Sequence, residues 1–135
     1  SDGSLTAVDL VSGKPAWRVD RIATRCGGLP TPPCGNAVYS PPTVAGEVVF
    51  VGLQDGTLRG YATATGRELV VLETAKKYEG VNGLPGAGGS IANGGPVIVG
   101  NMLYIMSGFQ MLDVGLPGNV LLAWEIPGAT AVAGD

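Results

Sequence analysis

Apolar residues along this chain come in short runs that glycine-containing turns separate. The run at 48–52 ends before an Asp-Gly pair, and the run at 57–62 ends before Thr65-Gly66-Arg67. Runs of this length leave no room for helices of ordinary size, and their content of Val, Ile, Leu and Tyr favours strands. The pattern therefore predicts an all-β chain.

The strand pattern repeats within the sequence. Asp-Gly-Ser-Leu at 2–5 returns as Asp-Gly-Thr-Leu at 55–58, an offset of 53, and the stretch 42–51 recurs at 96–105, an offset of 54. A third copy of the Gly-x-apolar element lies at 118–124. Two independent segments with one shared period indicate a repeated structural unit.

Four antiparallel strands in about 50 residues are typical of one blade of a β-propeller. We expect a complete blade at 42–72, the two outer strands of a blade at 1–19, and an incomplete blade at 96–126, all within one partial propeller domain at 1–135. The expected strands lie at 4–9, 14–19, 42–45, 48–52, 57–62, 67–72, 96–99, 102–107 and 119–126. These are about two and a half blades, which do not close on their own because propellers need four to eight.

An unclosed propeller segment leaves apolar blade faces and strand edges without partners. We expect such faces to bear Trp17, Leu121 and Trp124, and to be covered by the remainder of the propeller or by other copies of the chain. The contact is expected near Leu5, Trp17 and Val120. The first residue is a serine followed by a turn, which favours a processed chain or a fragment.

The composition agrees with many turns and excludes several functions. The chain has 23 glycines and 10 prolines in 135 residues, yet 45% of it is hydrophobic and 14% is charged. A net charge of −3 with scattered Lys and Arg excludes a nucleic-acid partner. The absence of histidine excludes Ser-His-Asp and Cys-His catalysis and histidine-ligated metals. No apolar run approaches the roughly 20 residues of a membrane span, and no export signal opens the chain.

One motif resembles a known family of propellers. The pattern Ala7-x-Asp9-x-x-Ser12-Gly13-Lys-x-x-Trp17 is similar to the tryptophan-docking repeat of quinoprotein propellers, which bind pyrroloquinoline quinone (PQQ). In that family the tryptophan packs against the neighbouring blade. The second copy of the motif in this chain departs from the pattern, since it has alanine at position 62 for the aspartate and valine at position 70 for the tryptophan.

A second series of motifs resembles the C-terminal part of polyvinyl-alcohol dehydrogenase-like quinoproteins, and the resemblance covers nearly the whole chain. The series comprises Tyr-Glu-Gly-Val-Asn-Gly at 78–83, Gly-Gly-Ser-Ile at 88–91, the stretch 95–109, and Pro-Gly-Asn-Val-Leu-Leu-Ala at 117–123.

This resemblance implies a quinoprotein alcohol dehydrogenase-like propeller that oxidises secondary alcohols with PQQ, for which calcium is the candidate companion ion, and passes electrons to a cytochrome c. It assigns no catalytic base and no metal ligand to a residue of this chain. The isolated chain is expected to be inactive. A second function stays open: a non-catalytic quinoprotein-like propeller that serves as an interaction scaffold in the cell envelope.

The longest connections, at 20–41, 73–95 and 108–118, all fall on one side of the expected blades, where sites on rigid scaffolds tend to lie. Glycine permits close approach of a flat ligand, and asparagine and serine offer hydrogen bonds to quinone oxygens. One interpretation is therefore that the Gly-, Asn- and Ser-containing segment 73–95 forms part of a PQQ pocket. The other is that this segment is a loop packed over the central channel. The candidate cofactor-binding residues are Asn82, Gly88, Gly89, Ser90 and Asn93.

Two further sets of side chains have both a structural and a functional interpretation. Glu79, Asp113 and Asp135 are candidates for a base or a calcium ligand by charge, although solvated surface positions explain them as well. The strand residues Trp17 and Trp124 are interpreted as blade-packing residues in preference to a platform for the cofactor.

Cys26 and Cys34 bracket a Pro- and Gly-rich stretch in the first long loop. This arrangement predicts a disulfide and hence an oxidising compartment, so the protein is expected to be periplasmic or secreted. Two free thiols in a cytosolic protein are the alternative. Many quinoprotein dehydrogenases have a bridge between adjacent cysteines beside PQQ, and the spacing of this pair does not reproduce it.

Overall fold

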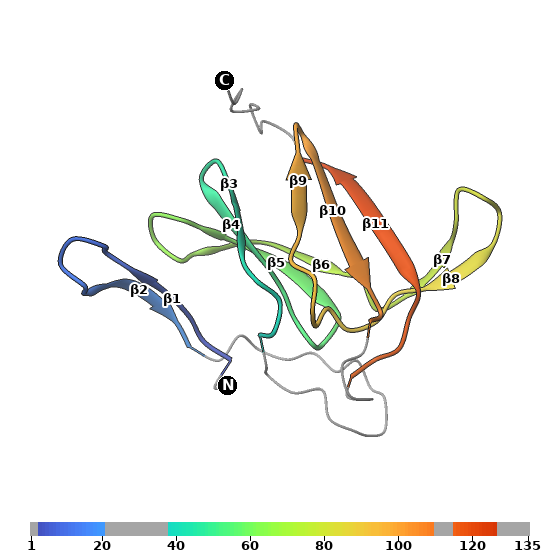
Figure 1. The fold of residues 1–135 in the computed structure, drawn as a ribbon, viewed down its shortest axis with the longest axis horizontal. Coiled ribbons are helices and arrows are strands. Elements are labelled where there is room, and N and C mark those ends of the chain that lie inside the picture. The colour runs from blue at the N-terminus through green and yellow to red at the C-terminus, as the bar shows by residue number, and fades with distance from the viewer. Residues whose placement is uncertain (1–2, 21–37, 110–114, 127–135) are drawn as a thin grey trace.

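The computed structural model describes residues 3–20, 38–109 and 115–126, and these residues form eleven strands and no helix (Figure 1). The strands build four antiparallel sheets, none of which closes on itself. The all-β, unclosed propeller-type class is confirmed. In chain order the strands are β1 (Leu5–Val8), β2 (Pro15–Val19), β3 (Thr43–Ala45), β4 (Val48–Gly52), β5 (Thr57–Ala62), β6 (Glu68–Glu73), β7 (Lys77–Glu79), β8 (Pro85–Ala87), β9 (Val97–Val99), β10 (Met102–Ser107) and β11 (Val120–Glu125).

The central sheet has the order β3-β4-β5-β6, the meander expected of one blade. Each strand begins and ends within a residue or so of its expected position. The outer sheets are β1-β2 and β11-β10-β9, so the described part of each lacks strands that the central sheet has. The division into blades at 1–19, 42–72 and 96–126 within one propeller domain at 1–135 stays a prediction.

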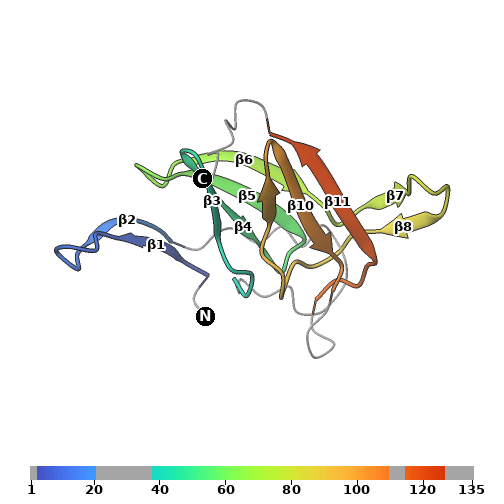
Figure 2. The ribbon, with the colours of Figure 1, turned by 45° about the horizontal axis from the view of Figure 1, so that its top comes forward.

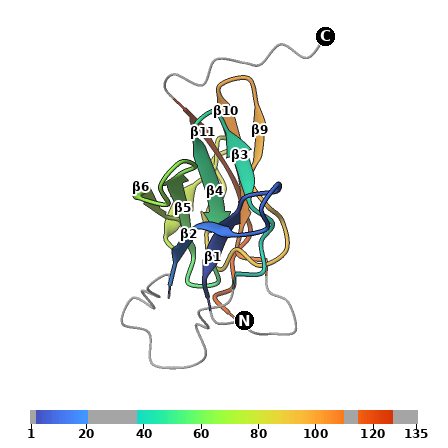
Figure 3. The same cartoon turned by 90° about the vertical axis from the view of Figure 1, so that its left-hand side faces the viewer.

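The two outer sheets pack on opposite faces of the central sheet. Alternate residues of a strand point to opposite faces, and accordingly Val49 and Val51 contribute to one apolar cluster while Phe50 contributes to the other. Leu5, Trp17 and Val19 of the β1-β2 sheet cover the first cluster. Residues of β10 and β11 complete the second, which holds Leu103, Ile105, Leu122 and Trp124. Figure 3 shows β1 and β2 in front of β4 and β5, with β10 and β11 behind.

This packing corrects part of the expectation for the open ends. Trp17 and Trp124 were expected on uncovered faces, but both pack into apolar clusters within the chain, and so does Leu5. Leu121 is 67% exposed, as expected. The reason is that side chains alternate between the two faces of a strand: Leu121 points away from the central sheet, whereas Leu122 and Trp124 point toward it.

The segment 73–95 was expected to be a loop, but part of it is the hairpin β7-β8, which projects beside β11 (Figure 2). Its turn contains Asn82-Gly83, with Gly83 at a φ of 74°. Gly80 N donates to Leu84 O at 2.8 Å, and Leu84 N donates to Asn82 Oδ1 at 3.1 Å. Asn-Gly is a strong hairpin signal, so the sequence did carry the information.

Candidate functional site

The loop side of the blades is held together by three connections that lie far apart in the sequence. They are the β4-β5 turn, the segment after β8 and the segment before β11. Ile91 N donates to Leu53 O at 3.0 Å, and Ser90 N donates to Leu116 O at 2.8 Å. Two features stand out at this end: a polar network on β5, and a buried glycine-serine segment at 88–90.

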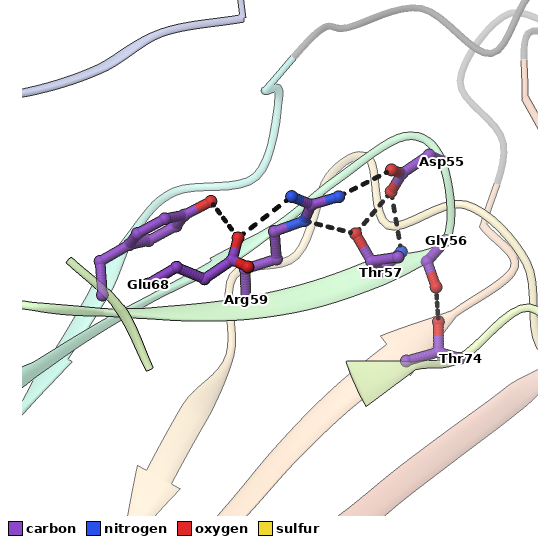
Figure 4. Close-up of polar contacts among 7 residues, drawn as sticks. Asp55, Gly56, Thr57, Arg59, Glu68 and Thr74 are labelled. Carbon is purple, nitrogen blue, oxygen red and sulfur yellow. Dashed lines mark hydrogen bonds and ion pairs between the residues drawn. The ribbon is translucent and has the colours of Figure 1, made fainter. Parts of the chain in front are cut away.

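The polar network begins at the β4-β5 turn and runs along one face of β5 (Figure 4). Thr57, Arg59 and Tyr61 alternate along the strand and therefore share that face. The Asp55 carboxylate accepts hydrogen bonds from Thr57 N at 3.0 Å and from Thr57 Oγ1 at 2.6 Å. Arg59 Nη1 lies 3.2 Å from Glu68 Oε2, and Arg59 Nη2 lies 3.5 Å from Asp55 Oδ2.

Burial makes this network costly to break. Arg59 is 5% exposed and Asp55 is 2% exposed. A buried charge requires a partner of opposite sign and hydrogen bonds that satisfy its polar atoms. Arg59 has both, since its Nε also donates to Thr57 Oγ1 at 3.2 Å. The network therefore links the β4-β5 turn to the start of β6.

Tyr61 extends the network toward the edge of the blade. Its hydroxyl donates to Glu68 Oε2 at 3.4 Å. Burial of the ring raises the pKa of Tyr61, and the nearby Glu68 carboxylate raises it further while Arg59 opposes the shift. Tyr61 is thus a protonated donor at neutral pH. This network was not expected from the sequence, because the strand pattern does not show which charged side chains a neighbouring sheet buries.

Gly88 and Gly89 lie where backbone of the same chain leaves no space for a side chain. A Cβ at position 88 would come within 1.8 Å of Thr74 O, and a Cβ at position 89 would come within 2.1 Å of Leu116 O. Both residues are buried. Their lack of a side chain is therefore explained by close approach of protein backbone.

Ser90 is fully buried and links the three connections. Its hydroxyl donates to Gln54 O and accepts a hydrogen bond from Leu116 N at 2.7 Å. Its carbonyl accepts a hydrogen bond from Gly108 N at 2.9 Å.

A pair of buried hydroxyl groups supports the same segment. Thr74 Oγ1 and Ser107 Oγ are 2.7 Å apart. Thr74 Oγ1 donates to Gly56 O at 2.8 Å, and Ser107 Oγ accepts a hydrogen bond from Gly89 N at 2.9 Å. The pair connects the ends of β6 and β10 through the glycine segment.

The structure does not bring all five candidate cofactor-binding residues together. Gly88, Gly89 and Ser90 are adjacent and buried. Asn82 lies in the turn of the projecting hairpin, and Asn93 is exposed. Contact of any of these residues with a cofactor stays a prediction.

The other candidate residues have separate positions. Glu79 is exposed on β7. Cys26, Cys34, Asp113 and Asp135 lie outside the described residues, so the disulfide stays a prediction. Within the described ranges, no group of three Cys, Asp or Glu side chains is placed to hold a metal ion. Over the same ranges, no helix has the length and apolarity to cross a membrane.

The tryptophan-docking motif performs the packing that the resemblance implied. Trp17 Nε1 donates to Thr63 O, in the turn after β5, at 2.7 Å. The indole lies against Gly66 of the same turn. At the other end of the motif, Ser12 N donates to Asp9 Oδ1 at 2.7 Å, which lowers the pKa of Asp9. The β1-β2 sheet is thereby fixed to the central blade.

The stacked antiparallel sheets, with a tryptophan docked between two of them, define a segment of β-propeller type. Two curated proteins match the chain, and both are polyvinylalcohol dehydrogenases. The protein from Pseudomonas sp. is 35% identical over 103 residues, which are 70% of this chain and 16% of that protein. The protein from Sphingopyxis sp. (strain 113P3) is 31% identical over 134 residues, which are 92% of this chain and 20% of that protein.

These matches confirm the resemblance to polyvinyl-alcohol dehydrogenase-like proteins. The chain spans a fifth or less of the length of these curated relatives. No protein-family model matches it.

Proposed function

We propose that this chain is part of a PQQ-dependent alcohol dehydrogenase of the polyvinyl-alcohol type. The enzyme would oxidise a secondary alcohol to a ketone and pass the two electrons to a cytochrome c. The observation that supports this proposal is the similarity to the polyvinylalcohol dehydrogenase of Sphingopyxis sp., which extends over 92% of the chain.

PQQ would supply the two-electron acceptor for this oxidation, with calcium as the candidate companion ion. The buried residues at 88–90 do not fit as its direct ligands. The space beside Gly88 is filled by Thr74 O, and the hydroxyl of Ser90 is already bonded to Gln54 O and Leu116 N. We therefore assign these residues a supporting role, in which they hold the loop side of the blades rigid, and we derive no catalytic step from them.

The same proposal places the protein in the periplasm or outside the cell. It rests on Cys26 and Cys34, whose spacing in a Pro- and Gly-rich segment suits a disulfide.

The proposal is tested on the complete polypeptide that contains these 135 residues. The purified protein is loaded with PQQ and calcium, and oxidation of a secondary alcohol is followed with an artificial electron acceptor. Turnover that requires PQQ supports the proposal, and the same preparation without PQQ is the control. If PQQ binds without turnover of polyvinyl alcohol or short secondary alcohols, the dehydrogenase assignment is wrong.

A second candidate is a non-catalytic propeller that acts as an envelope scaffold. The internal use of Gly88, Gly89 and Ser90 favours it, because packing alone accounts for those residues. In the experiment above, a folded complete protein that does not bind PQQ supports this alternative.

A further inference from the structure

The described part of the chain contains two Asn-Gly steps, Asn82-Gly83 in the β7-β8 turn and Asn93-Gly94 in the segment before β9. Asparagine is a thermolabile residue, because its side-chain amide is lost when the main chain attacks it. The attacking atom is the backbone nitrogen of the next residue, and a glycine there has no side chain to obstruct the approach. Both steps are exposed, so water reaches both.

The hairpin turn protects Asn82. Gly83 N donates to Gly80 O at 2.8 Å, so the nitrogen that would attack is engaged as a donor. Asn82 Oδ1 accepts a hydrogen bond from Leu84 N at 3.1 Å, which holds the side-chain amide in the turn. An attack at this step has to break both hydrogen bonds, and each of them raises the barrier.

The step at Asn93 has neither restraint. Within the described ranges, no hydrogen bond involves the side chain of Asn93 or the backbone nitrogen of Gly94. A Cβ at position 94 would have nothing within 4 Å, so the space beside this glycine is open. The carbonyl oxygen of Gly94 accepts a hydrogen bond from Ser40 Oγ at 3.1 Å, which holds the residue in place without engaging its nitrogen.

The other two described asparagines are poor candidates for the same reaction. Asn101 and Asn119 precede a methionine and a valine, whose side chains obstruct the attack. Asn101 Nδ2 donates to Glu125 Oε1 at 2.8 Å. Asn119 Oδ1 accepts a hydrogen bond from Ala87 N at 3.0 Å. Asn93 thus combines exposure, a following glycine and an unrestrained amide.

We infer that Asn93 is a site of spontaneous deamidation in the folded protein. The backbone nitrogen of Gly94 forms a bond to Cγ of Asn93, and its proton passes through solvent to the side-chain nitrogen, which leaves as ammonia. The product is a succinimide ring. Water then adds to one of the two ring carbonyls and breaks its bond to nitrogen, which leaves aspartate or isoaspartate at position 93. Water is the co-reactant, no oxidant or reductant takes part, and the inference does not depend on the proposed redox function.

The reaction changes the loop side of the blades in two ways. Either product adds one negative charge at an exposed position. Isoaspartate also carries the main chain through the former side-chain carbon, so one methylene is added before Gly94. The next residue, Gly95, approaches Pro41 so closely that a Cβ would lie 2.5 Å from Pro41 O, and the longer main chain has little room there. We expect the isoaspartate form to lose the contact between Ser40 and Gly94.

The test follows both Asn-Gly steps in one sample of the complete polypeptide that contains these 135 residues. The folded protein is incubated in mildly alkaline buffer and digested, and mass spectrometry quantifies the peptide that contains each step. Enzymatic methylation of isoaspartate identifies that product. We expect Asn93 to deamidate at least about tenfold faster than Asn82, a ratio that corresponds to about 1.4 kcal/mol of barrier. In guanidinium chloride, where neither step is restrained, the two rates should converge.

The variant Gly94→Ala tests the attacking atom. Its methyl group hinders the approach of the nitrogen, whereas the fold accommodates it, because the Cβ position is open and the φ of Gly94 lies outside the left-handed region. Deamidation at Asn93 should slow several-fold. The rate at Asn82 in the same molecules is the matched control and should not change.

Four results would overturn the inference. Three are equal rates at the two steps of the folded protein, faster reaction at Asn82, and an unchanged rate at Asn93 in Gly94→Ala. The fourth is a folded protein in which neither step reacts although both react in guanidinium chloride, since the fold would then protect Asn93 as well.

Discussion

The indole of Trp17 lies on Gly66, so closely that a Cβ at position 66 would come within 2.6 Å of the ring atom Cε3. Gly66 has a φ of 70°, a conformation that glycine adopts freely. One glycine thus serves both the turn between β5 and β6 and the contact that fixes the first sheet to the central blade.

The first prediction separates these two roles. Gly66→Ala should lower the free energy of unfolding by about 1–2 kcal/mol through the left-handed backbone and by about 1–3 kcal/mol more through overlap with Trp17. Gly13→Ala is the control, since Gly13 has a φ of 69° and nothing within 4 Å of its Cβ position. Urea denaturation should show a clearly larger loss for Gly66→Ala. Equal losses would mean that the indole contact contributes nothing.

The second prediction concerns the buried charge on β5. Arg59→Met should destabilise the chain by about 3–5 kcal/mol, because it removes a buried charged partner of Asp55 and Glu68. Arg18→Met is the matched control: the pair of Arg18 with Asp20 is exposed, and such pairs contribute about 0–1 kcal/mol. Both values come from chemical denaturation at neutral pH. A loss for Arg59→Met no larger than that of the control would contradict the structural role of the network.

The difference between these two arginines shows where sequence reasoning stops. Strand positions follow from the runs of apolar residues and the turn residues, because burial on one or both faces of a sheet dictates them. Which charged side chains are buried does not follow from the sequence. Arg18 and Arg59 both stand in short strands, and only the packing of a neighbouring sheet distinguishes them. The network at Asp55 was missed for that reason.

The glycines at 88 and 89 illustrate a second limit. A sequence shows that backbone must approach closely at such positions, but it does not show whether the approaching group is a ligand or the protein itself. Here the approaching atoms are the carbonyl oxygens of Thr74 and Leu116. The hairpin β7-β8 was missed although Asn82-Gly83 marks its turn, because its strands have three residues each and Pro85-Gly86 is a poor strand sequence.

The third prediction follows from the packing at Gly88. Gly88→Ala should disrupt the loop side of the blades, because the added Cβ would clash with the backbone oxygen of Thr74. That oxygen cannot move without displacing Thr74. Gly94→Ala is the control, because the Cβ position there has nothing within 4 Å. Hydrogen exchange should show faster exchange of the amides of Gly89 and Ser90 in Gly88→Ala alone. Unchanged exchange would show that the segment adapts and is not rigid.

The fourth prediction concerns Cys26 and Cys34. A thiol assay on denatured, unreduced protein should detect no free thiol, because the two residues are expected to form a disulfide. Reduction should lower stability by roughly 2–3 kcal/mol, as the chain-entropy model gives for a short loop. The variant Cys26→Ser/Cys34→Ser should behave like the reduced protein. Detection of two thiols per chain would remove both the bridge and the argument for an oxidising compartment.

The last prediction concerns the outer face of the β9-β10-β11 sheet, which points away from the central blade. Val97, Val99, Met106 and Leu121 are 58%, 64%, 58% and 67% exposed there. Burying apolar surface stabilises an association by about 25 cal/mol per Å², so we expect the isolated chain to self-associate through this face at tens of micromolar.

Met106→Lys should shift that association toward monomer, because it places a charge in the middle of the face. Val44→Lys is the control, since Val44 is an exposed apolar residue, 62% accessible, on the edge strand β3. Sedimentation velocity over a range of concentrations measures both variants. A monomer at every concentration, or an equal response to the two substitutions, would mean that the outer face of this sheet is stable in water without a partner and that the association expected from an open blade does not occur.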